Sequence, residues 1–231
     1  MKSLFIFRRD FRIKDNIAFN EMLKNSTHIY PIFIFTPEQI THNIYKSDNS
    51  VQFMIESLLD LYKDIKITFC YGSIIDVIED IVLKNNIEAI YCNTDYTPYA
   101  IKRDEMINSL AKKLNILFNY YHDITLFEPN TVLNKSGTIY MKYTPFYKHL
   151  LTLGVKKPHT TILDSSKIKQ PRTKYSIDQS KLKSFYHENP SINIHGGRVI
   201  ALKILTNIKK FSKYTFCKII MDFFNCQFIL F

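Results

Sequence analysis

The sequence has few of the residues from which nucleotide-binding loops are built. Glycine occurs only five times in 231 residues, at positions 72, 137, 154, 196 and 197. None of these glycines belongs to a G-x-G-x-x-G or a G-x-x-x-x-G-K-[ST] pattern. Such loops need glycine because the backbone must approach a phosphate closely. An ordinary dinucleotide-binding loop and a P-loop are therefore not expected.

Cysteine and histidine are also too sparse and too scattered for a metal centre. The four cysteines show no C-x-x-C spacing, and the seven histidines stand singly along the chain. Neither a zinc site nor a disulfide framework is expected from this pattern. The amino-terminal residues lack the basic and then apolar stretches of a signal peptide. We therefore expect a reduced, soluble, intracellular protein.

The net charge of +10 is confined to the carboxyl-terminal third of the sequence. Residues 1–150 hold 17 Lys and Arg against 17 Asp and Glu, whereas residues 151–231 hold 14 basic and 4 acidic residues. A basic segment can follow phosphates. This one contains proline and serine and few aromatic residues up to position 183, which favours a solvated linker over a nucleic-acid interface.

Apolar runs alternate with helix-length amphipathic segments over the first 125 residues. The runs are nearly continuous, which predicts strands buried on both faces of a parallel sheet. The intervening segments carry apolar residues at helical spacing, such as Val51, Ile55 and Leu58. The pattern predicts a doubly wound α/β domain with five parallel strands. The expected strands are residues 3–8, 28–35, 66–71, 87–93 and 116–121.

Polar segments follow the expected first, second and fourth strands, at residues 8–12, 36–38 and 93–99. In a doubly wound sheet with a central first strand, these segments meet at the carboxyl edge, where ligands bind. Their arginines, aspartate and tyrosines suit a planar, polar, partly anionic ligand. The alternative, that Arg9 and Asp10 pair with neighbours and cap helices, fits the pattern equally well.

Several separate motifs resemble the photolyase/cryptochrome family, in the family's order and spacing. The opening motif, residues 5–16, reads FIFRRDFRIKDN, and a second, residues 93–104, reads NTDYTPYAIKRD. The resemblance extends over roughly residues 2–214. The further matching segments are residues 50–54, 135–137, 143–148, 196–198 and 201–203.

The resemblance implies a light-driven DNA repair enzyme. In the family, a helical carboxyl-terminal domain holds FAD, and the reduced flavin passes an electron to a cyclobutane pyrimidine dimer flipped out of the duplex. The amino-terminal α/β domain carries an antenna, either a folate or an 8-hydroxy-5-deazaflavin. Tryptophans of the helical domain reduce the flavin, and this chain has no tryptophan.

Part of the antenna site of deazaflavin-binding members is matched. The matching positions are Arg9, Phe33, Asp95 and Arg103. Two acidic residues expected by the resemblance are replaced by Thr36 and Thr97, and the folate-type pair that would fall at Tyr99 and Ala100 does not match either. No catalytic residue of the family is matched.

By this resemblance, the chain divides into four parts. Residues 1–125 form the α/β domain, residues 126–194 an interdomain linker, and residues 195–214 the start of the helical domain. Residues 215–231 are an apolar tail unlike the family and too short to span a membrane. We expect residues 1–125 to fold alone, and the segment after them to have little to pack on.

Three functions are compatible with this division. The chain is the antenna-binding part of a photolyase whose FAD domain comes from a separate chain, and damaged DNA is then met only through that partner. Alternatively, it is a free chromophore- or nucleotide-binding module. The third possibility is an inert remnant of a truncated gene. In each case the chain alone is not expected to be an active enzyme, and no membrane partner is expected.

Overall fold

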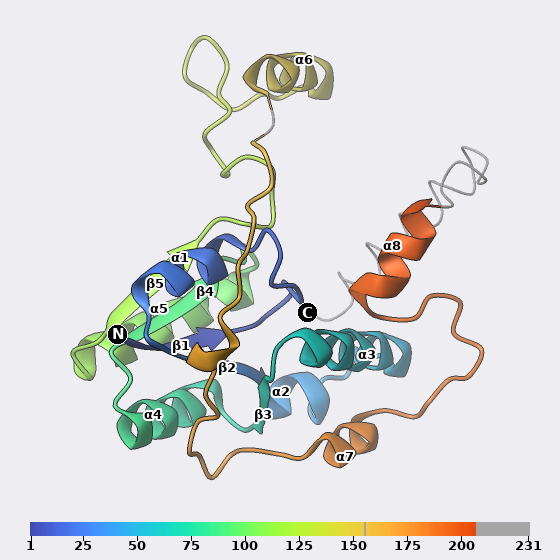
Figure 1. Cartoon of the computed structure of the whole chain (residues 1–231). Coiled ribbons are helices and arrows are strands. Elements are labelled where there is room, and N and C mark those ends of the chain that lie inside the picture. Colours follow the sequence, from blue (N-terminus) through green and yellow to red (C-terminus); the bar gives the residue numbers. More distant parts are fainter. Residues whose placement is uncertain (155, 207–231) are drawn as a thin grey trace.

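Five parallel strands form one sheet at the centre of the molecule (Figure 1). We describe it from a computed structural model, which describes residues 1–154 and 156–206. The strand order is β3-β2-β1-β4-β5, so β1 is central as the sequence predicts. The bounds are β1 Lys2–Ile6, β2 His28–Phe35, β3 Thr68–Tyr71, β4 Ala89–Asn93 and β5 Leu117–Tyr121.

Helices cover both faces of the sheet and bury its alternating side chains. Along β1, Phe5 packs into the core beneath α1 (Ile17–Asn25) and α3 (Asp48–Asp64). Leu4 and Ile6 pack into the opposite core beneath α4 (Ile74–Asn85) and α5 (Pro98–Lys113). Successive residues of a strand point to opposite faces, so continuous apolar strands need this double cover. The doubly wound α/β architecture is confirmed.

The edge strand β5 differs from the expectation of burial on both faces. Leu117 is 55% exposed and Tyr120 is 56% exposed, although both stand in an apolar run. β5 pairs only with β4, because it is the last strand of the sheet. An edge position leaves part of a strand open to solvent whatever its sequence.

Residues 126–154 leave the domain and project from it, as Figure 1 shows. They contain α6 (Tyr143–Leu153), and none of the residues 126–154 is fully buried. Apolar side chains on this segment are open to solvent, including Leu126 at 75% and Met141 at 88% exposure. We call residues 126–154 the projecting segment.

Residues 161–197, which we call the strap, return to the domain and lie along it. The strap contains two short 3₁₀ turns, Ser165–Lys167 and Lys183–Phe185, which flank α7 (Gln179–Leu182). Its Leu182 is fully buried and Phe185 is 6% exposed, both within the same core as Phe5. The Phe185 ring lies 5.1 Å from the ring of Phe35 on β2.

Backbone hydrogen bonds also join the strap to the sheet. The Ile177 amide donates to the Phe69 carbonyl, and the Tyr71 amide donates to the Tyr175 carbonyl. The strap therefore pairs antiparallel with the edge strand β3 and covers its free hydrogen-bonding groups. The expectation that the segment after residue 125 has little to pack on is wrong for the strap, because its apolar side chains reach the core and its backbone reaches β3.

The helix α8 (Arg198–Thr206) follows the strap and starts beside α3. The predicted start of a helical domain at residues 195–214 lies partly outside the described residues, and the predicted tail at residues 215–231 lies wholly outside them. No helix in the described part of the chain combines the length and the apolarity needed to cross a bilayer.

Candidate chromophore-binding cleft

Two threonines shape the carboxyl edge of the sheet by capping helices. Thr36 directly follows β2, and its hydroxyl accepts a hydrogen bond from the Gln39 amide at the start of α2 (Pro37–Ile40). Thr97 caps α5 in the same way through the Ala100 amide. In each case proline follows the cap at the first helical position, where it needs no amide partner. The threonines that replace the family's acidic residues therefore serve the local helices.

Asp10 has a structural role at this edge, as one of the two sequence interpretations allowed. Its carboxylate accepts hydrogen bonds from the Arg8 amide at 2.9 Å and from the side-chain amides of Asn16 and Asn93 at 2.9 and 2.5 Å. The Asn93 side chain in turn accepts from the Ala18 amide in α1. This buried network fixes the loop after β1 against β4 and α1.

Arg8 and Arg103 share one carboxylate behind the cleft. Arg8 makes a two-pronged contact with Asp104, at 2.7 and 3.0 Å, and Arg103 Nε lies 3.1 Å from the same carboxylate. The Arg8 and Arg103 side chains are each only 8% exposed. Two buried guanidiniums thus share one negative charge, and the sharing leaves positive charge at the cleft.

The Arg103 side chain has an unused donor in this site. Its Nη2 is buried and donates no hydrogen bond to any residue that the structure describes. Burial first, and then the neighbouring Arg8 charge, lower the pKa of Arg103. A buried charged donor without an acceptor is costly, on the order of 1–3 kcal/mol. An anion or a carbonyl oxygen bound in the cleft would remove that cost.

Arg9 and Asp95 face each other across the same cleft, with Nε and Oδ2 3.3 Å apart. The Asp95 side chain is only 6% exposed, and its Oδ1 accepts a hydrogen bond from the Thr97 amide. Its Oδ2 accepts none from the described part of the molecule. Burial lowers the pKa of Arg9, although the Asp95 charge opposes this shift. The site therefore offers a buried acceptor, Asp95 Oδ2, as well as the buried donor Arg103 Nη2.

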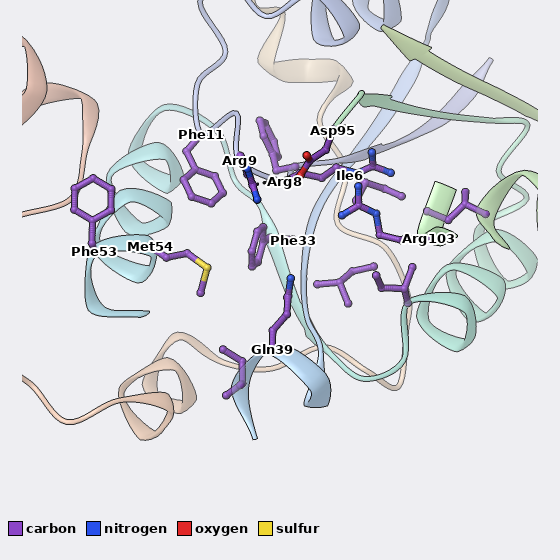
Figure 2. A pocket seen from close by; sticks show the side chains of 15 residues that line it. Ile6, Arg8, Arg9, Phe11, Phe33, Gln39, Phe53, Met54, Asp95 and Arg103 are labelled. Carbon is purple, nitrogen blue, oxygen red and sulfur yellow. Dashed lines mark ion pairs between the residues drawn. The ribbon is translucent and has the colours of Figure 1, made fainter. Parts of the chain in front are cut away.

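Figure 2 shows Arg8, Arg9, Asp95 and Arg103 at one side of a cleft whose other walls are apolar apart from Gln39. Phe11 and Phe33 meet edge to face, with ring centroids 5.6 Å apart. The cleft encloses a cavity of about 90 Å³. That is room for several waters or for part of a flat ring. The further lining residues include Ile6, Phe7, Ile34, Gln39, Ile40, Phe53, Met54, Ile74 and Ile107.

The four site residues predicted from the sequence all line this single cleft: Arg9, Phe33, Asp95 and Arg103. The folate-type positions do not join them. Ala100 is fully buried within α5, and Tyr99 is 38% exposed with its ring 5.9 Å from the Arg103 guanidinium carbon.

Sequence reasoning missed the role of Asp104. This residue does not line the cleft, but it pairs with the lining residues Arg8 and Arg103 and so sets the charge there. It also missed Gln39, which lines the cleft from the short helix α2 that Thr36 caps. Phe53 and Met54 stand in a matched motif, and that was the available signal for their place in the wall.

Comparison with known proteins gives the family. The DNA photolyase family model matches residues 3–162. The chain belongs to the DNA photolyase family. It is 28% identical over 228 residues to a deoxyribodipyrimidine photo-lyase of Buchnera aphidicola subsp. Baizongia pistaciae, a match that covers 93% of this chain and 47% of that enzyme.

Solved structures of photolyases and a cryptochrome share the fold. An archaeal photolyase from Sulfolobus tokodaii superposes with a TM-score of 0.74 and 31% identity, over 89% of this chain and 46% of that one. A cryptochrome from Synechocystis has the same TM-score at 18% identity, over 89% and 45% of the two chains. The photolyase-family chain described here thus spans about half the length of these relatives.

The cleft suits an organic ligand better than a metal ion. Its lining carries three arginines against Asp95, and Asp104 behind them offsets one further charge. The described residues contain no group of three or more His, Cys, Asp or Glu side chains that could hold a metal. Aromatic walls, a buried donor and net positive charge together fit a planar anionic ring system.

Proposed function

We propose that the cleft binds a planar, anionic antenna chromophore of the flavin or deazaflavin class, as part of a light-driven DNA repair system. The observation that carries this proposal is the buried Arg103 Nη2, which lacks an acceptor beside an apolar cleft. Proteins seldom bury a charged donor without a partner, and those that do often use it for a ligand.

The Sulfolobus relative supports this class of ligand. Its crystal structure holds two FAD molecules, which implies a novel light-harvesting cofactor in that photolyase. Members of the photolyase family bind FAD and antenna chromophores, so a second flavin-like ring has a precedent at 31% identity. The 8-hydroxyl of a deazaflavin ionises to an oxyanion, which suits the positive lining better than a neutral ring would.

Four of the lining residues have a defined part in binding. Arg103 Nη2 donates to an oxyanion or a carbonyl of the ring, and Asp95 Oδ2 accepts from a ring N–H or hydroxyl. The Phe11 and Phe33 rings exclude water and contact the ring system. When bound, the chromophore absorbs light and passes its excitation to a flavin. The protein's own contribution is orientation and a fixed charge environment.

We further propose that the flavin and the damaged DNA belong to a separate chain that carries the helical half of a photolyase. The projecting segment supports this partner, because it exposes Leu126, Met141 and Leu151 to solvent. Exposed apolar side chains in a group are typical of an interaction surface. Co-expression with the unmatched half of the Buchnera enzyme, assayed as light-dependent loss of thymine dimers, tests this partner.

The binding proposal is tested by titrating the full chain with 8-hydroxy-5-deazaflavin, FAD and methenyltetrahydrofolate in parallel. We expect saturable one-to-one binding of a flavin-class ring, with a shifted absorption band and altered fluorescence. Preferential binding of the folate would mean that the cleft is an antenna site but that its chromophore is a folate and not a flavin or deazaflavin. The absence of saturable binding by all three would contradict the proposal.

A further inference from the structure

Beside the cleft, three titratable side chains that the proposed function does not use contact one another in a row. Tyr96 Oη lies 2.6 Å from His122 Nδ1, and His122 Nε2 lies 2.8 Å from Glu128 Oε1. The Tyr96 and His122 rings are nearly parallel, at 7°. Tyr96 follows β4 and His122 follows β5, so the chain links the loops after two neighbouring strands.

The two contacts of His122 select one tautomer. The Glu128 carboxylate oxygen lies 2.8 Å from His122 Nε2, and this contact favours the tautomer with the proton on Nε2. In a neutral imidazole the other nitrogen is then an acceptor. The Tyr96 hydroxyl therefore donates to Nδ1. This arrangement places the phenolic proton within hydrogen-bond reach of His122 Nδ1.

The surroundings keep the Tyr96 hydroxyl protonated. Burial raises the pKa of Tyr96, a hydrogen bond with Thr125 opposes the shift, and the charges of Glu128 and Asp95 raise it further. The phenolate is thus not a starting point for chemistry at neutral pH. An electron can leave this phenol easily only if its proton moves at the same time. His122 Nδ1, 2.6 Å from the hydroxyl, is placed to accept that proton.

We propose that Tyr96 is a one-electron donor whose proton moves to His122 when it is oxidised. The Tyr96 O–H bond breaks, the proton forms a new bond to His122 Nδ1, and the electron passes to an oxidant. The products are a neutral tyrosyl radical and an imidazolium held by Glu128.

The oxidant in the complete system is a photoexcited flavin-class chromophore in the cleft that has not passed its excitation on, and it is reduced by that one electron. This part rests on the proposed function. Asp95, the residue that directly precedes Tyr96, lines the cleft. The reverse step, in which an electron and the His122 proton return to the radical, restores the tyrosine.

A second tyrosine–histidine pair provides a matched control. Tyr140 Oη lies 3.0 Å from His149 Nδ1 in the projecting segment. No carboxylate contact to His149 is found among the residues that the structure describes. A tyrosine with a histidine acceptor alone can thus be compared with one whose acceptor is itself backed by a carboxylate.

The test uses the full chain and about one electron equivalent of hexachloroiridate(IV), so that the radical settles on the most easily oxidised tyrosine. Radical yield is read by freeze-quench electron paramagnetic resonance. We expect Tyr96→Phe and His122→Gln each to lower the yield by about tenfold or more. Tyr140→Phe should leave it unchanged. If His122→Gln fails to fold by circular dichroism, Glu128→Gln replaces it, with an expected several-fold loss.

An undiminished radical signal in Tyr96→Phe, or in a folded His122→Gln, would overturn the proposal. Because the iridium oxidant needs no chromophore, this result does not depend on the cleft. A second arm illuminates the chain in the presence of added FAD. If the iridium arm is positive and the light arm is silent, the donor stands and the chromophore site fails.

Discussion

The strap and the projecting segment are neighbours in sequence, yet they relate to the domain in opposite ways. The strap buries Leu182 and Phe185 and pairs with β3, whereas the projecting segment has no fully buried residue. Both contain apolar residues among polar ones, and the projecting segment has the longer helix, α6, while the strap has only α7 and two 3₁₀ turns. The difference shows that a segment outside the βα repeat becomes part of a fold through a few apolar anchors that reach an existing core, and not through its average composition.

The largest effect should come from removing the strap altogether. A chain that ends at residue 154 loses two side chains of the core, and each such loss costs about 2–5 kcal/mol. Since domains of this kind are stable by only about 5–15 kcal/mol, we expect the shortened chain to lose most of its stability. Urea unfolding measures it. A midpoint equal to that of the full chain would mean that residues 1–125 form a complete folding unit by themselves.

A matched pair of substitutions sharpens the comparison without a deletion. Phe185→Ala in the strap should destabilise the protein by about 3–5 kcal/mol, because it opens a cavity beside Phe35 and Tyr71. Phe146→Ala in α6 should cost less than about 1 kcal/mol, because that ring is only partly covered and packs on Tyr140. Thermal unfolding of both variants is the measurement. Equal losses would erase the distinction between the two segments.

Acid should loosen the strap in particular, because carboxylates of the domain hold it. Partial burial raises the pKa of Glu56, but hydrogen bonds from Gln52, the Gly196 amide and His195 outweigh it and leave the pKa below its usual value. Asp80 has a lowered pKa for similar reasons, with Lys84 and the strap as its partners.

A carboxylate whose pKa is lower in the folded chain stabilises the fold above the unfolded pKa, and this contribution is lost as the pH falls through the folded value. The Lys169 and Ile177 amides of the strap donate to the Ile29 and Phe69 carbonyls of the sheet. We therefore expect these two amides to lose protection from hydrogen exchange below about pH 4. Amides of the central strand β1 should keep theirs. Simultaneous loss of protection in both places would show that the strap does not open separately.

Much of the fold follows from sequence pattern because its signals are local. Alternating apolar strands and helical stripes such as Val51, Ile55 and Leu58 predict the elements, and parallel connections predict a doubly wound sheet. The exposed side of β5 was not predictable from its apolar run, since edge position is a property of the whole sheet.

The strap could not be predicted from its sequence. Leu182 and Phe185 stand as isolated apolar residues in the polar run KLKSF, without any periodicity. Their burial depends on where a long irregular segment crosses the sheet.

The sequence predicted part of the candidate site, because some of its residues stand in recognisable motifs. Arg9, Phe33, Asp95 and Arg103 follow from matched motifs, and strand order brings them to one edge. The role of Asp104 was not predicted, because its partner Arg8 lies 96 residues away in sequence. The missing acceptor of Arg103 Nη2 is visible only once the side chains around it are placed.

The central claim is that Arg103 presents a free buried donor to a chromophore, and one matched pair of variants tests it most directly. Arg103→Met removes that donor and keeps an apolar stem, while Lys102→Met removes the neighbouring charge, which lies on the exposed side of α5. We predict that Arg103→Met weakens binding of 8-hydroxy-5-deazaflavin to the full chain by about tenfold or more in a fluorescence titration. Lys102→Met should bind as the unmodified chain does. Equal affinity of the two variants would contradict the account.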